Sequence, residues 1–264
     1  ALVLVTYALL IEAWRRLLQG WGGRLAFWDG ARIWTVSNLA RYVPGTLWSV
    51  GAMSVLADDA GVPPTAAAGA AIFNTLLNLA AGFIVLSGTG ADYIARLAPG
   101  VPYPRAFGAV IGIAGAVALP LCLPTLTGVA ARLLRREPPS APPLRTFVAA
   151  LLSNLIAWGI YGVAFGCFSR ALFPAAGATW LGYVAVFTGS YLTGFLALLA
   201  PGGLFVREAA MVYALTRTGM ATPADAAVLA VASRLWLTVL ELAPGLAFLA
   251  AGAVRAPRPR RSVS

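Results

Sequence analysis

Two pairs of charged residues stand inside apolar sequence in the second half of this chain. Arg207 and Glu208 follow a Pro-Gly-Gly step, and Arg234 and Glu241 lie in the apolar stretch 223–251. A charge at the centre of a bilayer costs several kcal/mol unless it faces a cavity or a partner. Arg234 and Glu241 are separated by about two helical turns, so they share one helix face about 10 Å apart. That distance is too long for direct pairing and suits the lining of one cavity.

Two Pro-Gly steps interrupt the apolar sequence, one in each half of the chain. Pro44-Gly45 follows Arg41, and Pro201-Gly202-Gly203 precedes Arg207. Proline cannot continue a helix, and backbone groups freed at membrane depth survive only inside protein or beside a water-filled cavity. In transporters such paired breaks mark the substrate site. Arginines beside helix N-termini supply positive charge and free N–H groups, which favours a phosphate.

Asn74 and Asn78, one turn apart in the stretch 65–88, complete the predicted binding set. Several members of this set also have a structural interpretation. The asparagines suit hydrogen bonding between helices, and Glu208 suits the positive end of its helix dipole. Arg41 suits a side chain that reaches the membrane interface. Arg234, near the middle of a span, has no easy route to the interface.

The composition is that of a polytopic membrane protein. Hydrophobic residues make up 60% of the chain and charged residues 11%, and the mean hydropathy is +0.82. These values lie outside the range of soluble domains. The chain has no histidine, and Cys122 and Cys167 both stand in apolar runs. The sequence therefore predicts no imidazole proton relay, metal site, disulfide framework, cofactor or enzymatic activity.

Apolar stretches predict an all-α membrane bundle. Those long enough to cross a bilayer lie at about 65–88, 106–124, 147–173, 180–200 and 223–251. The shorter stretches 33–57 and 203–218 follow or contain the Pro-Gly steps, and we interpret them as re-entrant or half-crossing helices. The dozen residues before Glu12 are too few for a span. We interpret them as a span truncated at its N-terminus, because a signal peptide would carry its positive charges first.

A basic, proline-rich stretch at 132–145 divides one membrane domain, residues 1–264, into two lobes. We place the first lobe at about 1–127, a cytoplasmic linker at 128–146, the second lobe at 147–254 and a basic tail at 255–264. The net charge is +10, and all 19 basic residues are arginine. The positive-inside rule puts the N-terminal arginines, the linker and the tail in the cytoplasm. On this count 201–222 must cross the membrane, whereas the first Pro-Gly segment starts and ends inside.

The two halves also align with each other. A shift of 157 positions superposes Pro44 and Gly45 on Pro201 and Gly202, and a few residues of slippage place Asn74 opposite Arg234. Matches between alanines, valines and leucines carry little weight in so apolar a chain. The proline and glycine agreements predict an internal repeat built around the two breaks.

The breaks and the charges that surround them resemble a known family. Arg41-Tyr42-Val43-Pro44-Gly45, Ala200-Pro201-Gly202-Gly203-Leu204 with Val206-Arg207-Glu208, and Ser233-Arg234-Leu235-Trp236 are similar to hallmark stretches of the lysylphosphatidylglycerol synthase transmembrane-region family, whose members are also called flippase-like membrane proteins. The similarity runs from about residue 33 to 248. It implies a multi-pass protein of the bacterial or archaeal cytoplasmic (inner) membrane that moves a polar lipid between leaflets, such as an aminoacylated phosphatidylglycerol or a polyprenyl-phosphate-linked sugar.

The chain departs from that family at two points. Members often carry an acidic-arginine pair where this chain has Phe73-Asn74, which weakens the expectation of a charged role for the first repeat. The sequence ends at Ser264 without the soluble aminoacyl-transferase domain of the synthases, so synthase activity is not carried over.

These features lead to one hypothesis and two rivals. In the hypothesis, Arg207 and Arg234 bind the phosphate of a lipid in a groove between the repeats, Glu208 and Glu241 balance them or contact a cationic head group, and Arg41 assists. The expected partners are membrane lipids and not nucleic acid. One rival is an intramembrane transferase on lipid-linked sugars, with Asp92 or Glu137 as its base. The other is a non-transporting partner of a lipid synthase or glycosyltransferase, with a dry interior and internally paired arginines.

Overall fold

The computed structural model describes residues 1–40, 48–90, 95, 103–133, 142–174, 178–197, 203 and 205–254. Within these ranges every regular element is helical. The helices are α1 (Leu2–Gly20), α2 (Phe27–Leu39), α3 (Trp48–Asp58), α4 (Pro64–Thr89), α6 (Pro104–Leu133), α7 (Leu144–Leu172), α8 (Trp180–Leu196), α9 (Val206–Arg217) and α10 (Pro223–Val254). The prediction of an all-α fold is confirmed.

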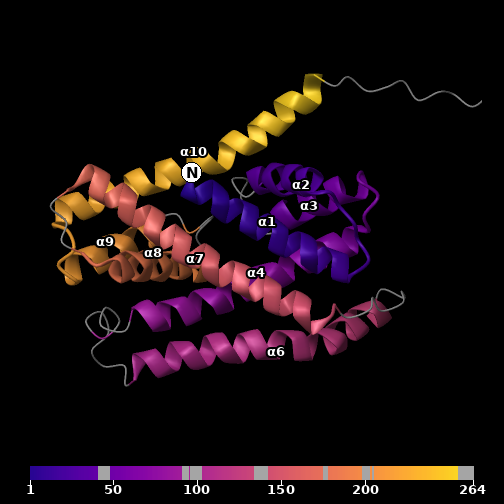
Figure 1. Cartoon of the computed structure of the whole chain (residues 1–264), viewed down its shortest axis with the longest axis horizontal. Helices are drawn as coiled ribbons and strands as arrows, with labels where there is room; N and C mark the ends of the chain where they lie inside the picture. The colour runs from indigo at the N-terminus through magenta and orange to yellow at the C-terminus, as the bar shows by residue number, and fades with distance from the viewer. Residues whose placement is uncertain are drawn as a thin grey trace, which may run out of the picture.

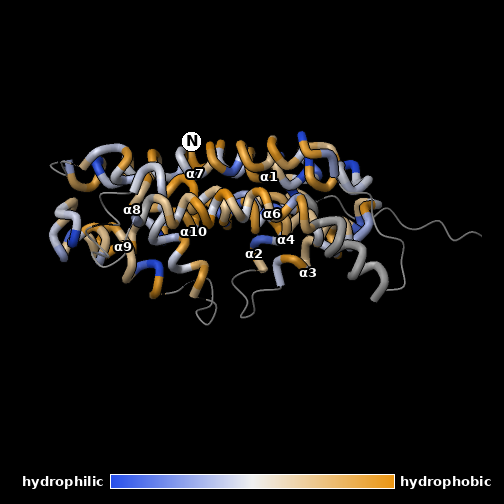
Figure 2. Tube along the Cα trace, turned by 90° about the horizontal axis from the view of Figure 1, so that it is seen from below, coloured by the Kyte–Doolittle hydropathy of each residue, from blue (hydrophilic) through white to orange (hydrophobic). Residues whose placement is uncertain are grey.

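Three helices are long and apolar enough to cross a membrane: Pro64–Thr89, Leu144–Leu172 and Pro223–Ala251. They correspond to the predicted stretches 65–88, 147–173 and 223–251. The predicted stretch 106–124 lies in α6, whose 30 residues reach about 45 Å. Figure 2 shows hydrophobic positions along the length of the long helices. The chain therefore has helices suited to a membrane, as its composition predicts.

The helices beside the Pro-Gly steps are short. α2, α3 and α9 have 13, 11 and 12 residues, or about 16–20 Å each, well below the thickness of about 30 Å of a bilayer core. The expectation that 201–222 crosses the membrane stays a prediction; within that range α9 ends at Arg217 and the chain turns before α10. α8 is also shorter than predicted and ends at Leu196 instead of near residue 200.

The predicted linker at 128–146 is partly helical. α6 continues to Leu133, and α7 already begins at Leu144. Arginine and leucine favour helix, so the basic residue Arg132 extends α6 and does not end it. Residues 134–141, which hold two of the four prolines of the predicted linker, lie outside the described residues.

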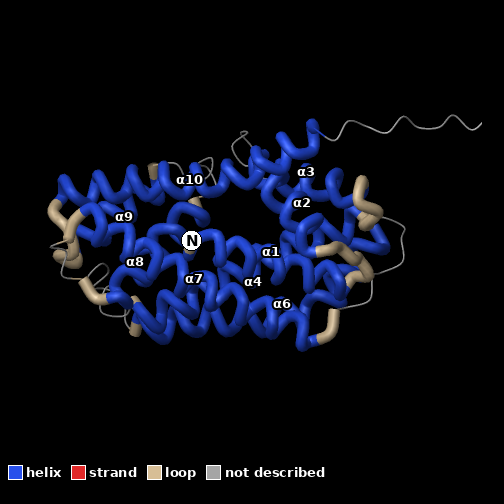
Figure 3. The backbone as a smooth tube through the Cα atoms, turned by 45° about the horizontal axis from the view of Figure 1, so that its top comes forward, coloured by secondary structure: helices blue, strands red, loops and turns tan. Residues whose placement is uncertain are grey.

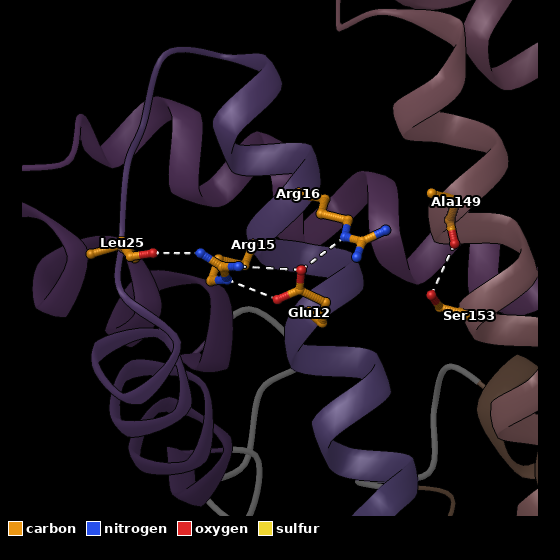
Figure 4. Close-up of polar contacts among 6 residues, drawn as sticks. All are labelled: Glu12, Arg15, Arg16, Leu25, Ala149 and Ser153. Carbon is orange, nitrogen blue, oxygen red and sulfur yellow. Dashed lines mark hydrogen bonds and ion pairs between the residues drawn. The ribbon is translucent and has the colours of Figure 1, made fainter.

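Charged residues do not end the first helix either. Glu12 accepts hydrogen bonds from Nε of Arg15 and Nε of Arg16, both at 2.8 Å, and Arg15 Nη1 donates to the carbonyl of Leu25 at 2.8 Å (Figure 4). These contacts let α1 run past its charges for 19 residues, about 28 Å. The short apolar run at the N-terminus is thus the first part of a longer helix.

The long helices lie side by side along the long axis of the molecule (Figure 1). α1 and α7 are antiparallel, since Gly20 packs against Pro142 and the rings of Tyr7 and Tyr161 are 6.3 Å apart. The C-terminal ends of α1, α6 and α10 lie at one end of the molecule, together with α2 and α3. The pair α8 and α9 lies toward the other end, as Figure 3 also shows.

Glycines set the closest helix contacts. A Cβ atom at Gly162 of α7 would lie 2.4 Å from the Cα of Val184 in α8, and one at Gly112 of α6 would lie 2.8 Å from the carbonyl oxygen of Ala80 in α4. Small residues of this kind let membrane helices approach closely. They build the layer of α4, α7 and α8 on which the charged residues of α9 rest.

Candidate functional site

The start of α9 lies flat against α8. Gly203 has φ +67, and a Cβ there would lie 2.7 Å from the carbonyl oxygen of Gly194. Gly194 itself faces the chain at Arg207, where an added Cβ would lie 2.6 Å from the Cβ of Arg207. The two glycines therefore permit a backbone contact that brings the first turn of α9 onto α8. Phe205, the residue before α9, has φ +66 and is exposed.

Arg207 is buried, with 7% of its surface exposed. Its Cζ lies 5.1 Å from the ring centre of Tyr191 and 5.5 Å from that of Phe187, both on α8. Its Nη2 atom has no hydrogen-bond partner in the described part of the chain. A buried guanidinium with an unused donor carries a desolvation cost that an anion would offset.

Glu208 pairs with Arg234 of α10. Oε1 of Glu208 lies 3.2 Å from Nη1 of Arg234, and the two side chains are 19% and 22% exposed. Oε2 of Glu208 is buried and has no hydrogen-bond partner among the described residues. The carboxylate also stands in the first turn of α9, where the helix dipole favours negative charge. Glu208 thus has a structural role through Oε1, and its Oε2 is available as an acceptor.

The predicted charges of the second half form one electrostatic cluster. Arg207 and Glu208 are neighbours in the first turn of α9, Glu208 pairs with Arg234, and Glu241 lies about two turns after Arg234 on α10. Two arginines and two glutamates give this cluster a formal charge of zero. The structure therefore brings together residues that lie up to 34 positions apart in sequence (241 − 207), from α9 and α10. Their role in binding a ligand stays a prediction.

Asn74 and Asn78 are bound to a third asparagine, Asn154 of α7. Asn78 Nδ2 donates to Asn154 Oδ1 at 2.7 Å, and Asn154 Nδ2 donates to Asn74 Oδ1 at 3.1 Å. The indole N–H of Trp158 donates to the carbonyl of Asn78 at 2.9 Å. These bonds join α4 to α7 and fit the interpretation of Asn74 and Asn78 as a link between helices. A head-group role for them stays a prediction.

Several predicted site residues lie outside the described residues: Arg41, Pro44, Gly45, Pro201 and Gly202. The described helices nearest to the steps have these bounds. α2 ends at Leu39 and α3 begins at Trp48, while α8 ends at Leu196 and α9 begins at Val206. Gly203 is described and has the left-handed conformation that a turn there requires. Asp92 and Glu137, the bases of the transferase rival, also lie outside the described residues.

Sequence reasoning missed four residues of this region: Phe187, Tyr191, Gly194 and Asn154. Phe187 and Tyr191 are one turn apart, a spacing that places two rings on one face of a helix. Asn154 is a third asparagine inside an apolar stretch, so the argument that selected Asn74 and Asn78 applied to it as well. Nothing in the local sequence marks Gly194 as a contact of Arg207.

The described residues contain no group of three or more histidine, cysteine, aspartate or glutamate side chains that could hold a metal ion. The chain matches no protein-family model, no curated protein and no solved structure.

Proposed function

We propose that the chain is a multi-pass membrane protein that moves an anionic lipid between leaflets, with Arg207 and Arg234 as the groups that receive its phosphate. The observation that carries the proposal is Nη2 of Arg207, which has no hydrogen-bond partner in the described ranges although the residue is only 7% exposed. A phosphate supplies an acceptor for this donor. Arginine suits phosphate because its planar fork presents paired donors.

The lipid phosphate is the moiety that needs this help. The hydrocarbon core of a bilayer offers a phosphate neither hydrogen bonds nor opposite charge. A phosphate that crosses this core without help therefore loses its full hydration energy. Arg207 and Arg234 offset that cost at one point along the path. Glu208 Oε2 offers an acceptor to an ammonium group on the same head group, because it is buried and unpartnered.

The arrangement of helices supports this proposal. Helices α2 and α3 form one short pair and α8 and α9 another, at opposite ends of the molecule (Figure 3). We interpret the pairs as re-entrant hairpins of two inverted repeats, the arrangement that puts transporter sites near the bilayer midplane. The C-terminal ends of α1, α6 and α10 lie together, and in the sequence each is followed by basic residues: Arg24, the linker and the tail. From the positive-inside rule we infer that this end faces the cytoplasm. The sequence resemblance implies a bacterial or archaeal inner membrane.

One contact favours the rival in which the chain is a non-transporting partner of a lipid enzyme. That rival expects the arginines to be paired inside the protein, and Arg234 does pair with Glu208. Arg207 differs, because the contacts that the described residues make with its guanidinium come from the rings of Tyr191 and Phe187, and none of these residues forms an ion pair with it. The difference between the two arginines is what favours a ligand.

The test is lipid movement in proteoliposomes. Full-length protein is reconstituted in phosphatidylcholine vesicles that contain a fluorescent phosphatidylglycerol, and dithionite measures how fast the probe reaches the outer leaflet. We expect Arg207→Gln and Arg234→Gln to slow this step about ten- to a hundred-fold, the effect of losing a charged hydrogen bond. Arg217→Gln is the matched control, since Arg217 is an exposed arginine of the same helix.

Wild-type rates in both Arg207→Gln and Arg234→Gln would contradict the proposal. A wild-type protein that moves no probe, but raises the activity of a co-purifying lipid enzyme, would favour the non-transporting partner. Turnover of a lipid-linked sugar by the purified protein would favour the transferase.

A further inference from the structure

Among the described residues, aromatic rings lie against the guanidinium of Arg207 and no acceptor bonds its Nη2. The distances from Cζ to the ring centres of Tyr191 and Phe187 are 5.1 and 5.5 Å, inside the range of about 6 Å for a cation–π contact. We infer that Tyr191 and Phe187 are positioning residues, whose ring faces fix Arg207 and leave its donors open for the lipid phosphate. The inference rests on the proposed function and deepens it.

The two arginines of the site show why rings are needed. Arg234 is held by a carboxylate, and its Nη1 is occupied by Glu208 at 3.2 Å. A ring face attracts the same positive charge without using the N–H groups, which lie in the plane of the guanidinium. Arg207 can therefore be held in place while Nη2 has no partner. Removing the rings would leave the positive charge of Arg207 in the protein, but its guanidinium would no longer be held in one orientation.

The rings themselves are fixed by α7. Trp158 packs edge-on against Tyr191 at 5.4 Å, and Tyr161 stacks on Phe187 at 5.5 Å. Phe165 lies 5.7 Å from Phe187. A guanidinium on so crowded a surface has few alternative positions. Pre-organisation of this kind improves affinity because less freedom is lost when the ligand binds.

Binding of a short-chain lipid by the full-length protein in detergent tests the inference. The probe is dioctanoyl phosphatidylglycerol, and the measured quantity is its Kd. We expect Tyr191→Leu and Phe187→Leu each to weaken binding about ten-fold, whereas Tyr191→Phe keeps the affinity within about two-fold because it keeps the ring. Tyr183→Leu is the matched control, since Tyr183 is a buried ring of α8 near Arg170, 5.7 Å from its Cζ.

Two outcomes would overturn the inference: wild-type binding by both leucine variants, or binding by Tyr191→Phe as weak as that by Tyr191→Leu. The second would assign the effect to the hydroxyl. If Tyr191→Leu does not fold, Phe187→Leu and Tyr191→Met make the same test. Arg207→Gln separates the two proposals. If Arg207→Gln loses binding and the leucine variants keep it, only the inference is wrong. If Arg207→Gln keeps binding, both the proposed function and the inference are wrong.

Discussion

Gly194 of α8 lies directly against Arg207 of α9, so closely that a Cβ on Gly194 would be 2.6 Å from the Cβ of Arg207 and 3.2 Å from its Cα. The Cα and Cβ atoms of Arg207 thus occupy the space that a side chain at position 194 would need. This contact sets the distance between α8 and the first turn of α9. It also sets how deeply the guanidinium is buried against the rings of α8.

Gly194→Ala should therefore disable the site without unfolding the protein. The new methyl group pushes the first turn of α9 away from α8, and we expect lipid movement to fall about ten-fold or more because a displacement of about 1 Å is enough to misplace a binding group. Gly189→Ala is the control on the same helix, since a Cβ there meets Leu86 at an ordinary 3.5 Å. Equal transport by the two alanine variants would show that the close contact has no functional role.

Asn154→Ala should loosen the contact between α4 and α7. The variant removes two hydrogen bonds to Asn74 and Asn78 and leaves those amides without their partner. Hydrogen bonds between membrane helices contribute about 0.6 kcal/mol each and at most about 1.7, so we expect a loss of about 1–2 kcal/mol. The measurement is the unfolding free energy in mixed detergent micelles.

Ser153→Ala is the neighbouring control for that measurement. Ser153 bonds only within its own helix, to the carbonyl of Ala149 at 2.9 Å (Figure 4), and should change stability little. A loss of stability in Asn154→Ala no larger than in Ser153→Ala would contradict the proposed link between the helices.

The apolar spans were predictable because their signal is local. Residues 65–88, 147–173 and 223–251 each contain enough consecutive apolar residues to define a helix of membrane length, and the structure has those helices. The interruption of helices near Pro201 was also predictable, since proline and glycine act on the backbone of their own positions. That charges in apolar sequence need partners was predictable too, and Glu208 and Arg234 do pair across α9 and α10.

The partners of these residues were not predictable in the same way. Which carboxylate pairs with Arg234, and which rings lie beside Arg207, depends on how α8, α9 and α10 pack, and packing depends on contacts between residues distant in sequence. The depth of the second Pro-Gly segment stays a prediction. Charge counting assigned a whole crossing to 201–222, whereas α9 has 12 residues, about 18 Å.

Glu208→Gln should change which lipid the site prefers. The cluster loses one negative charge, so its formal charge becomes +1, and Oε2 no longer offers a charged acceptor to an ammonium group. We expect the ratio of phosphatidylethanolamine to phosphatidylglycerol transport to fall about ten-fold, the typical effect of losing one charged hydrogen bond. Competing fluorescent probes in the same vesicles measure this ratio. Unchanged preference would show that Glu208 serves only Arg234 and the helix dipole.

Gly162→Ala should separate α7 from α8. A Cβ at Gly162 would lie 2.4 Å from the Cα of Val184, a backbone atom that cannot rotate away. Forcing the helices apart costs about 1–3 kcal/mol, as overpacking of other cores does.

Gly159→Ala, one turn earlier in α7, is the opposite case. None of the described atoms lies within 4 Å of its added methyl group, and alanine favours helix by up to about 1 kcal/mol over glycine. Thermal unfolding in detergent should therefore show a lower Tm for Gly162→Ala and an equal or higher Tm for Gly159→Ala. Equal shifts in both variants would mean that the close approach of α7 and α8 does not determine stability, and that the layer beneath Arg207 is held by its aromatic contacts alone.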